Sequence, residues 1–171
     1  MQTLNDNPDR ALLEKIIAEQ TFDFAIETTE GLKELGARLV SGSPGELEFS
    51  FMVSPKAIQG NGVVSGGTLM TMLDYAMAYA VLSKLPFGKT CATTSIAVNM
   101  QSAATPKRLK VTGNVDRVGR QVAFARSEVH DVERNILIAN ASATFLVMDV
   151  NPGGKNLTNN YTRRPVSVEE T

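Results

Sequence analysis

The spacing of apolar residues along the first third of the chain predicts one helix and then one hairpin. Asn7 and Pro8 have the residue types of an N-cap and a first helical position, and apolar residues follow at helical spacing, so an amphipathic helix is predicted over residues 8–20. From Leu35 to Ser54 apolar and polar residues alternate on both sides of the turn-prone SGSPG, which predicts a β-hairpin. Residues 55–67 form a glycine-rich loop.

A second helix is predicted from Gly67 to Leu85. This segment is rich in helix-forming residues and apolar on nearly every face, a pattern typical of a helix that is enclosed by protein. A membrane span is the alternative interpretation. The apolar run is shorter than the roughly 18–20 residues that a span needs and contains Asp74, so we favour the enclosed helix.

The chain after Lys89 has the alternation of a sheet. Four β-rich stretches cover residues 90–103, 108–118, 121–132 and 135–148, and turn signals between them predict an antiparallel meander. We therefore expect an α+β domain at residues 35–150 in which an antiparallel sheet curls around one helix, preceded by a helical extension (1–34) and followed by an irregular tail (151–171). Such a sheet has an exposed edge that dimerisation would cover.

Composition excludes several classes of protein. Lys and Arg number 17 against 18 for Asp and Glu, so no overall field attracts nucleic acid or an anionic membrane. The single cysteine, Cys91, excludes an internal disulfide and suits a reducing cytoplasm, and the N-terminus lacks the pattern of a secretory signal. With one histidine, His130, and one cysteine, we expect no metal site and no serine or cysteine triad.

One carboxylate interrupts the uncharged centre of the chain. Charged residues make up 20% of the sequence, yet the run from Ala57 to Ser83 contains only Asp74. No basic residue lies one helical turn away from it, so its burial would cost several kcal/mol unless another segment pairs with it. This departure from a well-formed core indicates a functional site. The alternative is an aspartate that only hydrogen-bonds a backbone amide or a neighbouring subunit.

The start of the same helix has the residues of an anion site. Ser65 can cap the helix, and Gly66 and Gly67 expose backbone amides at its positive end, where an oxyanion or a polarised carbonyl would bind. The alternative is a plain capping turn. A phosphate loop is excluded because Thr68 stands where its lysine belongs.

The segment GNGVVSGGTLMTMLDYAMAYAV, followed by a strand and the turn Arg117-Val118-Gly119-Arg120, resembles the hotdog-fold acyl-CoA thioesterases of the phenylacetate-degradation (PaaI-like) type. The resemblance covers about residues 35–149. Those enzymes carry His-Gly-Gly and then an Asp seven residues after the last glycine, which matches Gly67 and Asp74. Their Asn or Gln 15 residues before the acid matches Gln59, and Ser65 replaces their histidine.

The resemblance implies a hotdog fold and the hydrolysis of acyl-CoA to a free acid and CoA without a separate cofactor. It implies a catalytic set of Asp74, Gln59, Gly66 and Thr93. It implies that substrate contacts come from Asn61, Ser65, Gly67, Thr94, Arg117, Gly119 and Arg120. Asp74 would act as general base or nucleophile, the Gly66 amide would polarise the carbonyl, Gln59 would orient the carbonyl or the water, and Thr93 would position water.

The basic turn at Arg117, Gly119 and Arg120 would hold the CoA phosphates, and a solvated surface turn is its alternative. In hotdog dimers Gln59 and Asp74 of one site would come from different subunits, so a homodimer or a dimer of dimers is expected. Hotdog dehydratases need a histidine beside the acid, and none lies near this helix. A non-catalytic acyl-CoA binding or sensing protein remains the alternative function, because Ser65 replaces the histidine.

Overall fold

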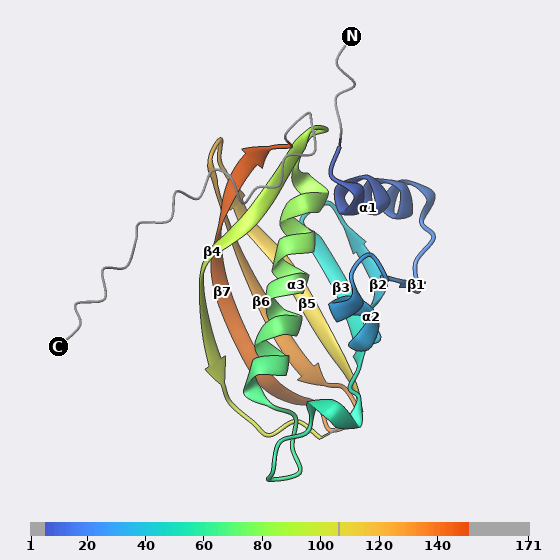
Figure 1. Cartoon of the computed structure of the whole chain (residues 1–171), viewed down its shortest axis with the longest axis vertical. Coiled ribbons are helices and arrows are strands. Elements are labelled where there is room, and N and C mark those ends of the chain that lie inside the picture. Colours follow the sequence, from blue (N-terminus) through green and yellow to red (C-terminus); the bar gives the residue numbers. More distant parts are fainter. Residues whose placement is uncertain (1–5, 106, 151–171) are drawn as a thin grey trace, which may run out of the picture.

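An antiparallel sheet curls around helix α3 in the computed structural model, which describes residues 6–105 and 107–150 (Figure 1). The helical elements are α1 (Pro8–Glu19), α2 (Glu30–Glu34), the short 3-10 helix η1 (Pro55–Ala57) and α3 (Gly66–Lys84). The strands are β1 (Phe24–Ala25), β2 (Arg38–Ser43), β3 (Glu46–Met52), β4 (Lys89–Met100), β5 (Arg108–Val118), β6 (Val122–Asp131) and β7 (Ile136–Asp149). Their order in the sheet is β1-β2-β3-β5-β6-β7-β4.

The predicted α+β architecture is confirmed, and so are its long elements. The helix predicted over 8–20 is α1, where the Asn7 side chain accepts a hydrogen bond from the Arg10 amide and Pro8 begins the helix. The predicted hairpin is β2 and β3, and the second predicted helix is α3. The short β1, α2 and η1 were not predicted, because two to five residues are too few to show a period.

The prediction that all four later strands form one meander is wrong for β4. Strands β5, β6 and β7 follow one another in the sheet, but β4 pairs with β7 and lies at the edge. Both sides of β5 are occupied, by β3 on one side and β6 on the other, so β4 has no place beside it. The chain therefore runs from β3 through α3 to β4 at the edge of the sheet, and then returns to the centre of the sheet as β5 (Figure 1).

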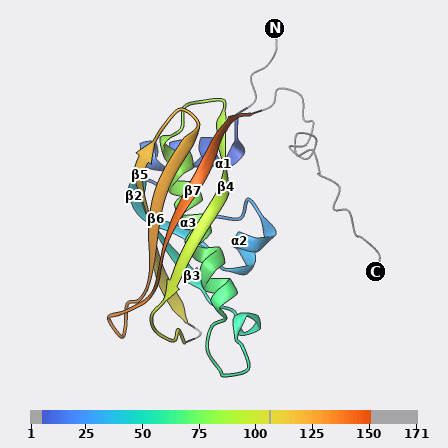
Figure 2. The same cartoon turned by 90° about the vertical axis from the view of Figure 1, so that its left-hand side faces the viewer.

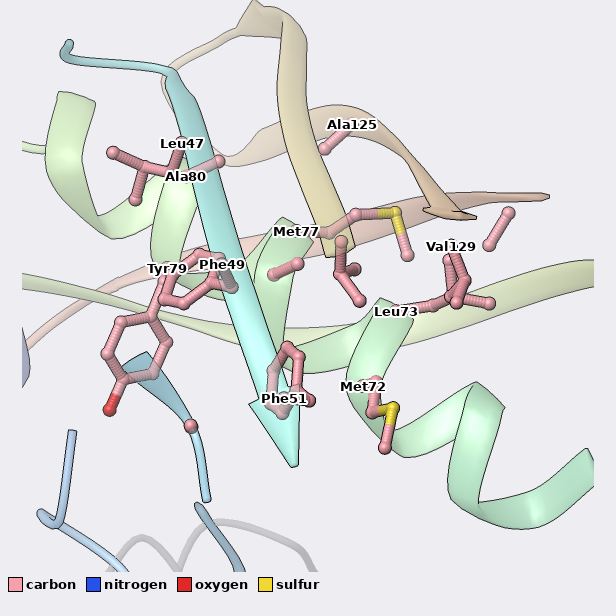
Figure 3. Packing of buried hydrophobic residues seen from close by; sticks show 14 of the residues in the cluster. Leu47, Phe49, Phe51, Met72, Leu73, Met77, Tyr79, Ala80, Ala125 and Val129 are labelled. Carbon is pink, nitrogen blue, oxygen red and sulfur yellow. The ribbon is translucent and has the colours of Figure 1, made fainter. Parts of the chain in front are cut away.

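The core lies between the inner face of the sheet and α3. Phe49 and Phe51 of β3 pack against the helix, and the Phe49 ring meets the Tyr79 ring edge to face at 5.9 Å (Figure 3). Strands β6 and β7 contribute small, branched and aromatic residues to the same cluster, among them Ala125, Val129 and Phe145. This contiguous apolar cluster sets the position of α3 on the sheet.

One stripe of α3 departs from the prediction of a helix enclosed on all sides. Nine of its residues are buried, but Gly67 and Thr71 are exposed and Asp74 and Ala78 are half-buried. These four positions follow one another at helical spacing, so they form one line along the helix. Within a single chain, α3 thus presents a partly open face that carries its one carboxylate.

The N-terminal helix closes the end of the molecule where α3 stops. Arg10 is buried there, ion-paired with Asp6 and Glu14, and its guanidinium donates to the Leu85 carbonyl at 3.4 Å. The Asn7 amide donates to the Thr90 hydroxyl at 2.9 Å. Figures 1 and 2 show α1 across this end, away from the start of α3.

The predicted irregular tail at 151–171 lies outside the described residues. In the part of the chain that is described, no helix combines the length and apolarity needed to cross a membrane.

We expect Gly113→Ala to destabilise the protein by about 2–3 kcal/mol, because a methyl group there would overlap the Ala76 carbonyl of α3 and push the helix off the sheet. Urea unfolding measures the change. Gly60→Ala is the matched control, since an added methyl meets nothing within 4 Å. Equal stabilities for the two variants would contradict this close contact.

Candidate active site

Asp74 contacts a strand that is distant in sequence. The Thr93 hydroxyl of β4 donates a hydrogen bond to Asp74 Oδ1 at 2.8 Å. The carboxylate is half-buried and lies on the open stripe of α3. Its second oxygen therefore remains accessible from the open side of the helix.

A β-bulge decides which threonine faces Asp74. The register between β4 and β7 shifts between Thr93 and Ser95, so Thr94 is the extra residue. Thr93 pairs with the buried Phe145 and points to the helix side, whereas the Thr94 hydroxyl bonds Thr144 on the outer side, with its carbonyl at 3.0 Å. The structure thus brings Thr93 to Asp74 and does not bring Thr94 there.

The start of α3 is capped as the sequence predicted. The Ser65 hydroxyl accepts a hydrogen bond from the Thr68 amide at 3.2 Å and lies 2.8 Å from the Thr68 hydroxyl. Gly66 and Gly67 are exposed, and amides of the first helical turn have no partner inside a helix. The positive end of α3 is therefore open to an oxygen atom of a ligand.

The glycine-rich loop before α3 places Gln59 and Asn61 on the surface. The Gln59 amide donates to the Val63 carbonyl at 2.9 Å, and Gly62 adopts a positive φ of 75°, so the loop makes a tight turn. Gln59 and Asn61 are both exposed. The loop that carries them extends beyond the amide end of the helix (Figure 1).

The helix itself separates two of the predicted catalytic groups. Gly66 and Asp74 are eight residues apart on α3, which corresponds to roughly 12 Å along the axis. A hydrogen bond spans about 3 Å, so one thioester carbonyl cannot contact both groups of the same chain. The Gly66 amide and the Asp74 carboxylate of one chain therefore do not meet at one carbonyl group.

The predicted phosphate-binding turn lies at the other end of the sheet. Arg117 and Arg120 are exposed, and the Gly119 amide donates to the Val122 carbonyl at 2.8 Å in the turn between β5 and β6. This turn is next to the start of β4, whereas Gly66 lies near Met100 at the end of β4. Nine residues of strand separate Cys91 from Met100, or about 30 Å.

Two exposed methionines border the open stripe. Met70 of α3 is 41% exposed and Met100 is 47% exposed. A side chain added at Gly66 would begin 3.5 Å from the Met100 methyl group. Met77 by contrast is fully buried in the core. Only the pairing of β4 with β7 brings Met100 to the helix start, so no local pattern could have predicted it.

The single cysteine lies behind Asp74. The Cys91 thiol donates to the Ala78 carbonyl at 3.8 Å, and burial, followed by the charge of Asp74, raises the pKa of Cys91 to about 12. A thiol with this pKa is almost fully protonated at neutral pH and is a poor nucleophile. Within the described residues, no three His, Cys, Asp or Glu side chains are grouped to hold a metal ion.

Part of the chain matches a known protein family. A family model matches residues 61–138, from the loop before α3 into β7. The matching model is that of the thioesterase superfamily. The resemblance to hotdog-fold thioesterases is confirmed, and the sheet wrapped around α3 is the hotdog fold.

Individual relatives of this superfamily segment are distant. A Pseudomonas aeruginosa protein named as a presumed esterase is 28% identical over 101 residues, which cover 58% of this chain and 74% of that protein. A phenylacetic acid degradation-related protein from Ralstonia eutropha superposes with a TM-score of 0.69 at 23% identity, over 78% of this chain and 98% of its own. A Streptococcus mutans protein solved with acetyl CoA bound has a TM-score of 0.61 at 20% identity, over 66% and 89%.

We expect the Cys91 thiol of the folded protein to react with iodoacetamide at pH 8 about a thousandfold more slowly than in the urea-unfolded chain, because so little thiolate is present. Mass spectrometry of the alkylated protein over time measures both rates. Comparable rates would mean that the fold does not suppress the thiolate of Cys91, and a faster rate in the folded protein would place an activated second nucleophile beside Asp74.

Proposed function

We propose that this thioesterase-superfamily protein hydrolyses acyl-CoA to a carboxylic acid and CoA, with Asp74 as its catalytic carboxylate. The observation that carries the proposal is the hydrogen bond from Thr93 to Asp74 on the open stripe of α3. The bond fixes one carboxylate oxygen and leaves the other to meet water or the substrate. The fold and the superfamily match support the reaction class.

Asp74 serves this reaction in one of two ways. As a general base, it takes a proton from water while the water oxygen attacks the thioester carbon, and the C–S bond then breaks to release the CoA thiol. As a nucleophile, it attacks the same carbon and the C–S bond breaks, so that a mixed anhydride forms and CoA leaves as a thiolate that takes a proton from water; a second water then hydrolyses the anhydride to the free acid and restores the carboxylate. In both cases negative charge on the carbonyl oxygen is stabilised by the Gly66 amide at the helix start.

The site is assembled between two copies of the chain. The separation of roughly 12 Å between Gly66 and Asp74 along one helix prevents one subunit from supplying both. Two α3 helices that run antiparallel past each other bring the amide end of one near Asp74 of the other. The edge of β4 and the exposed Met70 and Met100 border the stripe and form the contact surface.

The same arrangement accounts for the distant basic turn. In an antiparallel dimer, Arg117 and Arg120 of one subunit approach the helix start of the other, where their charges attract the phosphates of CoA. The structural similarity to a protein that binds acetyl CoA supports a CoA thioester as substrate. We place the activity in the cytoplasm, whose reducing conditions suit the lone Cys91.

We expect Asp74→Asn to lower kcat for acyl-CoA hydrolysis by at least about a hundredfold, because the amide can neither accept the proton nor attack the thioester. Thiol release from a panel of acyl-CoA thioesters measures this. Asp149→Asn, which neutralises a 79% exposed carboxylate, is the matched control and should keep wild-type rates. Acyl-CoA binding without thiol release in the wild-type protein would instead favour an acyl-CoA sensor.

Mixing two inactive variants tests whether the site is shared. Asp74→Asn and Gln59→Ala should each be inactive alone, yet after subunit exchange heterodimers contain one site with both native residues and restore about a quarter of wild-type activity. Hydrolysis assays before and after exchange measure the recovery. A mixture that stays inactive despite proven exchange would mean that both residues serve the same subunit.

A further inference from the structure

The amide end of α3 is attached to the sheet through the chain that follows β4. The connection from β3 to α3 donates two backbone hydrogen bonds to this chain: the Val53 amide to the Lys107 carbonyl at 3.2 Å, and the Val64 amide to the Ala104 carbonyl at 2.9 Å. Val64 immediately precedes Ser65, the cap of α3. Ala104 therefore holds the residue that precedes the cap of α3, and Lys107 holds the beginning of the connection that leads from β3 to α3.

Lys107 is itself held by a buried carboxylate at the turn between β6 and β7. Asp131 is fully buried, and its Oδ1 lies 3.1 Å from the Lys107 ammonium and accepts a hydrogen bond from the Arg134 amide at 3.1 Å. Arg134 also donates to the Ala103 carbonyl at 3.4 Å. The turn between β6 and β7 thus contacts the chain after β4 at two places, Ala103 and Lys107.

The charge of Asp131 is needed for this role. Burial by itself raises the pKa of Asp131, but the Arg134 amide and the Lys107 ammonium outweigh it and leave the pKa below its ordinary value. Its Oδ2 is buried without a hydrogen bond, 3.9 Å from the Arg134 guanidinium. An asparagine could cap the turn by accepting from the Arg134 amide, but without the negative charge it would hold Lys107 more weakly.

We propose that Asp131 is a positioning residue for catalysis, which acts through Lys107 to fix the Gly66 amide at the start of α3. The inference rests on the proposed function, because it assigns a purpose to the position of those amides. A misplacement of about 1 Å in such a donor costs up to roughly a hundredfold in rate. The salt bridge therefore contributes to kcat from a place that the substrate does not touch.

The test compares two variants that each remove one partner of Lys107. Asp131→Asn keeps the shape and the acceptor for the Arg134 amide, and we expect kcat for acyl-CoA hydrolysis to fall at least about tenfold with a smaller change in KM. Glu133→Gln removes the 77% exposed partner of Lys107 and should leave kcat unchanged. Lys107→Met carries the same expectation as Asp131→Asn if the latter does not fold.

Amide hydrogen exchange gives a readout that does not depend on turnover. In Asp131→Asn we expect faster exchange in a peptide covering residues 57–69, with wild-type exchange in β2 and β3, and no change anywhere in Glu133→Gln. Wild-type exchange at 57–69 together with wild-type kcat in Asp131→Asn would overturn the proposal, as would equal effects of both variants. If the wild-type protein lacks thioesterase activity, the proposed function fails, while the exchange experiment still tests the positioning.

Discussion

The close contact between α3 and β5 is the constraint on which the rest of the structure depends. Gly113 has no side chain, so the backbone of α3 at Ala76 lies directly against β5. Each residue of a helix turns by about 100°, so Asp74 projects roughly 160° away from Ala76. The contact that buries one side of the helix therefore turns Asp74 toward the open side. A larger residue at position 113 would change both the depth and the rotation of the helix.

The β-bulge at Thr94 determines which side chains of β4 face α3. In a regular strand Thr93 and Ser95 would face the same side, and Ile96 and Val98 would face outward. The extra residue reverses the alternation, so that Thr93 faces Asp74 while Ile96 and Val98 still pack against the core. The strand thus contributes a hydroxyl to the site without losing apolar packing further along. Bulges are common beside active sites for this reason.

The separation of Gly66 from Asp74 connects the fold of the chain to its assembly. An α-helix is rigid, so no movement within one subunit brings its start to its third turn. In the proposed site, the amides at the start of α3 and Asp74 act together because the α3 helix of a second subunit lies alongside. The proposed support of the helix start by Asp131 and Lys107 would then fix where the amides of one subunit meet Asp74 of the other.

The sequence alone determined the long elements and indicated Asp74 as the candidate acid. The N-cap at Ser65, the apolar run of α3 and the lone charge at Asp74 are local patterns in the sequence. They carry the resemblance to hotdog thioesterases, which the family match over residues 61–138 confirms. The same resemblance implied Thr93 as the hydroxyl of the site. The tertiary structure alone decided that β4 pairs with β7, that one stripe of α3 stays open, that Met100 lies near the helix start and that Asp131 meets Lys107. These features depend on which strands occupy each edge of the sheet, and strand pairing is a competition between distant segments that leaves no local period in the sequence.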